Sequence, residues 1–162
     1  MYNFRTDMAD ERRDIYRKAN KLEGDIPGIK TEEKIENEHI KSNIVDIVNE
    51  QGEQALGKPI GKYVTFDLKN LRLADEDELE SSAVIISEEL KNIINDKIDK
   101  NGEVLVIGLG NQFVTPDSLG PKVVSEIEVT RHLIKYAPEC VVHGARSVSA
   151  VAPGVLGTTG IE

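Results

Sequence analysis

Four consecutive apolar residues, Val104 to Ile107, are followed at once by the glycine-containing segment Gly108-Leu-Gly-Asn111. An unbroken apolar run of this length is typical of a parallel β-strand that is covered on both faces, because a strand with one solvated face alternates. Glycine lets the backbone turn sharply or approach a neighbouring segment closely, so these glycines mark the end of the strand. The sequence therefore predicts an α/β fold with a parallel strand at residues 103–109.

A helix is predicted shortly after this strand. Apolar residues recur at helical spacing from Leu119 onward, at Val123, Val124, Ile127, Leu133 and Ile134. Asp117 and Ser118 come just before them, near a helix N-terminus, where exposed backbone N–H groups favour negative charge. We therefore expect a strand–loop–helix unit over residues 103–137 that presents the Asp117 carboxylate beyond the carboxyl end of a strand, where α/β folds commonly build sites.

Three roles other than catalysis are considered for the loop that carries Asp117. Nucleotide binding is disfavoured, because Phe113 occupies the third glycine position of a Gly-x-Gly-x-x-Gly fingerprint and no phosphate-binding Gly-Lys run occurs. A second possibility is that Asp117 is only an N-cap, the commonest role for an aspartate between a proline and an apolar helix. A metal site is the third, but the sequence contains no ligand spacing that commits to it, so we assign neither a metal nor a cofactor.

The N-terminal part of the chain predicts a different sheet. Isoleucines and valines alternate with charged residues over residues 26–48, which favours two antiparallel strands that turn near Asn37. Residues 63–68 alternate more cleanly and are expected to form a third strand, so we place the antiparallel strands within residues 26–70. A long helix with an apolar face is predicted over residues 75–100, and its acidic start suits the helix dipole.

Composition limits the classes of partner. The chain carries 29 acidic and 20 basic residues, a net charge of −9, which disfavours direct binding to nucleic acid or to an anionic membrane. Cys140 is the single cysteine, so no intramolecular disulfide can form. With no secretory signal pattern and no long apolar run, we expect a cytoplasmic protein in a reducing compartment.

Several segments of the chain are distinctive in their exact wording. They are Arg5-Thr-Asp7, Gly57-Lys-Pro-Ile-Gly-Lys-Tyr-Val64, Gly108-Leu-Gly-Asn111, Thr115-Pro-Asp117-Ser-Leu-Gly-Pro121, Val129-Thr-Arg-His132 and the run from Ser149 to Ile161. Together these segments closely resemble the germination protease of spore-forming bacteria. The resemblance implies a phosphorylase/hydrolase-like three-layer α/β core similar to that of hydrogenase-maturation endopeptidases, to which the N-terminal antiparallel sheet is added. It also implies an atypical aspartic-type endopeptidase that cleaves small acid-soluble spore proteins during germination.

The resemblance assigns a catalytic role to Asp117, as one of two essential aspartates. Two carboxylates that share a site hold one proton between them, so one can activate water while the other stays protonated. In the family the second aspartate lies on a later strand, in an Asp-Ala-Leu-like context, and no such segment occurs before Glu162. We therefore expect residues 8–162 to be the N-terminal part of a single protease domain, truncated and inactive in isolation.

Neighbouring residues are expected to support the carboxylate. Asn111 and Thr115 are candidates to orient it through hydrogen bonds, although both types are also common in turns. The loop is expected to need glycine at positions 108, 110 and 120 for close backbone approach or positive φ.

The resemblance also implies processing and assembly. Residues 1–7 would be a propeptide that the zymogen removes by cutting between Asp7 and Met8. The family further suggests a homotetramer in the forespore or spore core. Two alternatives remain: a non-catalytic peptide-binding fragment that lacks the second aspartate, and a metal-dependent maturation peptidase in which Asp117 would be a ligand.

Overall fold

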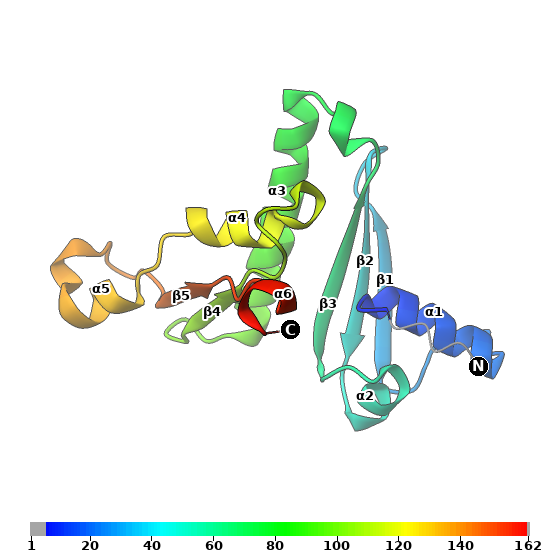
Figure 1. Cartoon of the computed structure of the whole chain (residues 1–162). Helices are drawn as coiled ribbons and strands as arrows, with labels where there is room; N and C mark the ends of the chain where they lie inside the picture. The colour runs from blue at the N-terminus through cyan, green and yellow to red at the C-terminus, as the bar shows by residue number, and fades with distance from the viewer. Residues whose placement is uncertain (1–5, 162) are drawn as a thin grey trace. The chain divides into compact units, whose positions relative to one another are not determined.

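A computed structural model describes residues 6–161, and the chain divides between Ile93 and Ile94 into two compact units (Figure 1). The elements of the first unit are α1 (Ala9–Asn20), β1 (Ile29–Ile35), β2 (Ile40–Ile47), α2 (Glu50–Leu56), β3 (Gly61–Leu68) and most of α3 (Glu76–Lys97). The second unit contains β4 (Val104–Ile107), α4 (Leu119–Glu126), α5 (Arg131–Tyr136), β5 (Val148–Val151) and α6 (Leu156–Thr159). The predicted mixed α/β class is confirmed.

The first unit is built on an antiparallel sheet with the strand order β1-β2-β3. Ile29 pairs with Ile47 across β1 and β2, and Ile44 pairs with Val64 across β2 and β3. The side chain of Asn37 closes the first turn, because its Oδ1 accepts hydrogen bonds from the N–H groups of His39 and Ile40, both at 2.8 Å. The predicted strands over residues 26–70 and the turn near Asn37 are confirmed.

Alternate residues of β2 point into the core of this unit. The buried cluster comprises Ala9, Ile26, Ile29, Val45, Ile47 and Leu56, so α1 and α2 both contribute to it. Sequence reasoning missed α2, although the signals were present. Asn49 caps this helix by accepting from the N–H groups of Gln51 and Gly52, and Gly57 ends it with φ +62°.

The long helix α3 confirms the helix predicted over residues 75–100. Its expected apolar face is only partly covered, because Leu79 and Leu90 are exposed whereas the isoleucines of this face are half-buried. The residues buried on it are Ser82 and Glu89. Glu89 forms ion pairs with Lys62 on β3, at 2.7 Å, and with Lys34 on β1, at 3.9 Å. A carboxylate can be buried when cations compensate it, so pairing with lysines of the sheet allows Glu89 to lie on the covered face of α3.

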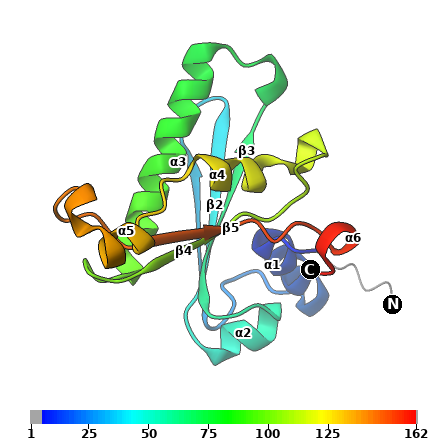
Figure 2. The ribbon, with the colours of Figure 1, turned by 60° about the vertical axis from the view of Figure 1, so that its left-hand side comes forward.

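The second unit contains the predicted parallel strand. β4 and β5 pair in parallel, with Val104 beside Val148 and Ile107 beside Val151. Figures 1 and 2 show α4 alongside these two strands. Coverage on both faces is not found, because Leu105 is 60% exposed and Ile107 is 54% exposed. Successive strand residues face opposite ways, and within this unit α4 covers only the face of the sheet to which Gly108 belongs.

Two glycines bring α4 against the end of β4. A Cβ atom on Gly108 would lie 2.2 Å from the backbone oxygen of Gly120, and a Cβ atom on Gly120 would lie 2.1 Å from the backbone oxygen of Leu109. Real Cβ contacts are never so short, so only glycine permits this approach. The sequence predicted that these two positions need glycine for close backbone approach or for positive φ, and close backbone approach is the reason that the structure shows.

The helix predicted after Leu119 is interrupted. The break covers residues 127–130, between α4 and α5. At its end, the N–H of Thr130 donates to the backbone oxygen of Val148 (3.1 Å), and Oγ1 of Thr130 accepts from the N–H of Val148 (3.0 Å). Pairing with β5 therefore satisfies the backbone of this segment and competes with a continuous helix. The apolar periodicity alone could not reveal a contact with a strand that comes later in the chain.

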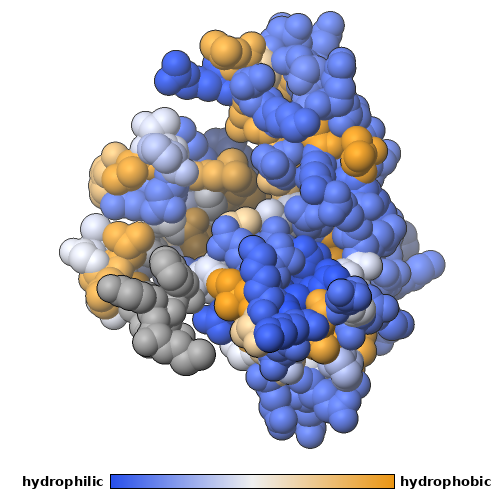
Figure 3. All heavy atoms as spheres, turned by 90° about the vertical axis from the view of Figure 1, so that its right-hand side faces the viewer, coloured by the Kyte–Doolittle hydropathy of each residue, from blue (hydrophilic) through white to orange (hydrophobic). Residues whose placement is uncertain are grey.

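The face drawn in Figure 3 is mainly hydrophilic, with hydrophobic side chains in small groups. Among residues 6–161, no helix combines the length and the apolar character needed to cross a bilayer.

Replacing Ile47, which is fully buried, by alanine should destabilise the first unit by about 2–5 kcal/mol, because apolar contacts are lost and a cavity remains. The matched Ile35→Ala change on β1 removes a side chain that is 78% exposed and should cost less than about 0.5 kcal/mol. Urea unfolding followed by circular dichroism measures both. Equal effects of the two substitutions would contradict the assigned core.

Gly120→Ala should destabilise the second unit by about 1–3 kcal/mol, since the new methyl group forces α4 away from the backbone of Leu109. Amide hydrogen exchange at Val106 and Gly108 measures this locally, and exchange should accelerate. The control is Gly157→Ala in α6, where an added Cβ meets nothing within 4 Å. Unchanged protection in the Gly120→Ala chain would show that the close approach is dispensable.

Candidate functional site

The loop between β4 and α4 closes on itself through backbone hydrogen bonds. The N–H of Val114 donates to the oxygen of Asn111 (3.1 Å), and the N–H of Asp117 donates to the oxygen of Val114 (2.8 Å). Pro116 lies in the short 3-10 helix Thr115–Asp117, where its fixed φ suits the turn. The loop therefore returns the chain from the end of β4 to the start of α4.

One backbone group holds Asp117 in two ways. The N–H of Asn111 donates to the backbone oxygen of Asp117 and also to its carboxylate Oδ2, with both distances 2.9 Å. A hydrogen bond from a backbone N–H to a carboxylate is charge-assisted and fixes the direction of the acceptor. The carboxylate is thus turned back toward the end of β4.

Gly110 makes this arrangement possible. Its φ is +128°, and a Cβ atom there would lie 2.1 Å from the backbone oxygen of Asp117 and 3.1 Å from its Oδ1. Both the backbone conformation and the lack of space require glycine.

Asp117 is not the N-cap of α4. The N-cap residue is Ser118, which is buried and whose hydroxyl donates to the backbone oxygen of Thr115 at 3.0 Å. The Asp117 carboxylate instead accepts its hydrogen bond across the loop, from the N–H of Asn111. The N-cap interpretation of Asp117 is therefore wrong.

The structure brings the predicted loop residues together, although two of them act differently from expectation. Asn111 orients Asp117 through its backbone N–H, while its side-chain Oδ1 accepts from the N–H of Phe113 at 3.0 Å. Thr115 contributes through its backbone carbonyl, which accepts from both the hydroxyl and the N–H of Ser118. Support for Asp117 thus comes from main-chain atoms, which leave no residue-type signature in a sequence.

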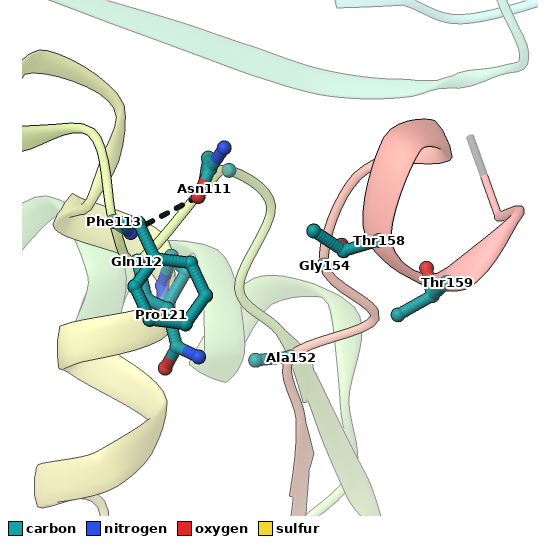
Figure 4. A pocket seen from close by; sticks show the side chains of 9 residues that line it. Asn111, Gln112, Phe113, Pro121, Ala152, Gly154, Thr158 and Thr159 are labelled. Atoms are coloured by element: carbon teal, nitrogen blue, oxygen red, sulfur yellow. Dashed lines mark hydrogen bonds between the residues drawn. The ribbon is translucent and has the colours of Figure 1, made fainter.

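A cavity of about 190 Å³ opens beside this loop (Figure 4). Its lining residues are Gly110, Asn111, Gln112, Phe113, Pro121, Ala152, Gly154, Thr158 and Thr159. Asp117 itself is not a lining residue, but it contacts both Gly110 and Asn111. Sequence reasoning missed the contribution of residues 152–159, because it depends on a contact between distant segments.

The residues around the predicted processing bond lie in the first unit. Asp7 and Met8 are exposed and precede α1. Arg12 ties this segment down, since its Nε donates to the backbone oxygen of Thr6 (2.9 Å) and its Nη1 donates to that of Leu56 (3.0 Å). The rest of the predicted propeptide, residues 1–5, lies outside the described residues.

Within the described part of the chain, no group of three or more histidine, cysteine, aspartate or glutamate side chains is arranged to hold a metal ion. Cys140 is exposed and ends the short 3-10 helix Pro138–Cys140.

Comparison with known proteins gives one consistent result. The family model described as germination protease matches residues 5–162. Curated relatives named germination protease include those of Clostridium perfringens (strain ATCC 13124), 46% identical over 162 residues, and Caldanaerobacter subterraneus subsp. tengcongensis, 48% identical over 160 residues. The matches cover 100% and 98% of this chain, but 49% and 46% of those relatives.

A relative from Priestia megaterium, also named germination protease, is 42% identical over 166 residues, which cover 99% of this chain and 44% of the relative. The chain thus spans about half the length of the curated relatives it matches. Identity of this extent over the whole chain, together with the family match, confirms the resemblance seen in the sequence. The chain belongs to the germination protease family.

Proposed function

We propose that this chain supplies the Asp117 half of an endopeptidase that hydrolyses small acid-soluble spore proteins during spore germination. The observation that carries the proposal is the Asn111 N–H, which fixes the Asp117 carboxylate at the carboxyl end of a parallel strand in a member of this family. That edge of an α/β sheet is where such folds place reactive groups.

Asp117 acts in this proposal as one of a pair of carboxylates. The unprotonated member of the pair removes a proton from water, which then attacks the carbonyl carbon of the scissile peptide bond. The protonated member donates a hydrogen bond to the carbonyl oxygen. The second carboxylate is proposed to come from the part of the relatives that lies beyond this match. The Asn111 N–H fixes Oδ2, so the direction of Oδ1 is set as well.

The enzyme is further proposed to be made as a zymogen that is cut between Asp7 and Met8. The exposed position of both residues supports this, as does the extended backbone of Met8, at φ −84° and ψ 132°. Peptides are commonly recognised in extended form because their backbone groups are then accessible. We also propose location in the spore core, a homotetramer, and that residues 8–162 belong to one protease domain.

Peptide binding without cleavage is a second candidate for the chain taken alone. The neutral cavity beside the Asp117 loop favours it, and the chain spans only about half the length of its relatives. Activity measured on the natural-length polypeptide and on the 162-residue chain separates the two candidates. Cleavage by both would remove this alternative.

Asp117→Asn in the natural-length polypeptide should lower the rate of cleavage of a small acid-soluble spore protein by about 10²–10⁴-fold, because the amide cannot accept the proton of water. The Asn111 N–H can still donate to the amide oxygen, so the fold should persist. Mass spectrometry of the products measures cleavage and the removal of residues 1–7. The matched control is Asp67→Asn, which changes an exposed aspartate on β3. The Asp67→Asn protein should cleave the substrate at the normal rate. Undiminished cleavage by a folded Asp117→Asn protein would end the proposal.

Gly110→Val should abolish cleavage to a similar degree while the first unit stays folded, because a β-branched residue cannot adopt φ +128° and would collide with Asp117. The control is Gly24→Val, where an added Cβ meets nothing within 4 Å. Cleavage assays are paired with the amide shift of Asn111, which reports its hydrogen bond to Asp117. Normal cleavage with an unchanged Asn111 shift would refute the role given to Gly110.

A further inference from the structure

The segment that precedes α1 is folded back on the first turns of that helix. The backbone oxygen of Thr6 accepts a hydrogen bond from Nε of Arg12 at 2.9 Å. The Thr6 hydroxyl accepts from the N–H of Met8 at 3.2 Å and donates to the carboxylate of Glu11. Thr6 is therefore held through both its main chain and its side chain, and it is half-buried although Asp7 and Met8 beside it are exposed.

Arg12 joins this segment to the rest of the first unit. Its Nη1 donates to the backbone oxygen of Leu56 at 3.0 Å. Leu56 is 2% exposed and is the last residue of α2, where backbone oxygens have no partner within the helix. The helices α1 and α2 are in contact (Figures 1 and 2). Because the planar guanidinium holds its N–H groups in a fixed arrangement, this one side chain bridges two backbone oxygens from distant parts of the sequence.

The bond between Asp7 and Met8 is exposed, but the groups around it are occupied. Besides the Thr6 oxygen and the Met8 N–H, the oxygen of Met8 is also used, because it accepts from the N–H of Arg12 at 3.2 Å. Ala9 follows the bond and is 3% exposed, within the core of the first unit. A protease that binds a peptide in extended form pairs with such backbone groups and reads the neighbouring side chains. The bond can therefore enter an active site only after this segment detaches from the core.

We propose that Thr6, Glu11 and Arg12 form a latch over the processing bond. The latch protects the bond from cleavage, and its opening limits the rate at which the zymogen is processed. The inference rests on the proposed function for the position of that bond. The protection is conformational, since the latch residues hold the flanking segment and take no part in hydrolysis. Removing a latch contact should therefore speed processing, whereas removing a residue that binds or cleaves the segment would slow it.

The first test measures opening of the latch without reference to cleavage. Hydrogen exchange at the Met8 amide is followed by NMR in the ¹⁵N-labelled 162-residue chain. Arg12→Gln removes both guanidinium hydrogen bonds and should accelerate this exchange about tenfold. Glu11→Ala removes only the acceptor of the Thr6 hydroxyl, on an exposed position, and should also accelerate it. Unchanged exchange in both variants would refute the latch.

Two matched substitutions and one internal probe serve as controls. Arg17→Gln removes an arginine near the other end of α1 that also donates to a backbone oxygen, at 3.1 Å, and Asp10→Ala removes another acid from the first turn. Both should leave exchange at Met8 unchanged. Exchange at Ile47, which is fully buried, should stay the same in every variant. Equal acceleration at Ile47 and Met8 in the Arg12→Gln chain would contradict the latch, because the first unit as a whole would then be opening.

The second test follows processing of the natural-length polypeptide by mass spectrometry. The Arg12→Gln polypeptide should lose residues 1–7 about tenfold faster than the unchanged polypeptide. Once processed, it should cleave a small acid-soluble spore protein at the normal rate. Equal or slower removal of residues 1–7, with the cut still between Asp7 and Met8, would overturn the latch and leave the proposed function standing.

The unchanged polypeptide separates the two proposals. No cut between Asp7 and Met8 in that polypeptide would refute the processing site of the proposed function, and the protective role of the latch with it, whatever the exchange at Met8 shows. A cut at that bond, together with faster exchange and faster processing of the Arg12→Gln polypeptide, supports both.

Discussion

Backbone contact between the end of β4 and the start of α4 is the constraint on which the candidate site depends. Neither Gly108 nor Gly120 has a side chain, so the two backbones approach more closely than any other residue pair would permit. The intervening loop must then return within a short span, and the N–H of Asn111 becomes the donor to both oxygens that Asp117 presents to it. The position of the Asp117 carboxylate therefore depends on the packing of the α4 backbone against the backbone at the end of β4.

Features with a local cause could be predicted from the sequence. The apolar run at Val104, the alternating strands before residue 70 and the long helix near Glu76 all agree with the structure, because each element carries its own periodicity. Features set by distant partners could not be predicted. Thr130 leaves the helical path to pair with Val148, and Glu89 is buried because lysines from two strands surround it.

The same distinction holds within the site. The carboxylate of Asp117 and the glycines around it could be selected from residue type and spacing, since few residues other than glycine tolerate their backbone geometry. The groups that hold the carboxylate were harder to foresee, because a backbone N–H belongs to every residue type except proline. The far wall of the cavity, at Thr158, comes from a segment distant along the chain, so residue spacing could not place it beside the loop.

Orientation of Asp117 and completion of the proposed carboxylate pair depend on different parts of the polypeptide. The hydrogen bonds that hold the Asp117 carboxylate and the turn before it join residues 111–117 to one another, so the loop organises itself locally. The proposed hydrolysis by a carboxylate pair needs a second carboxyl group, and the relatives have about as much chain again in which it could lie. The uncovered sheet face at Leu105 and Ile107 is consistent with this division, because parallel sheets are ordinarily covered on both sides. The local geometry of the Asp117 loop and the proposed cleavage by a carboxylate pair can therefore be examined independently.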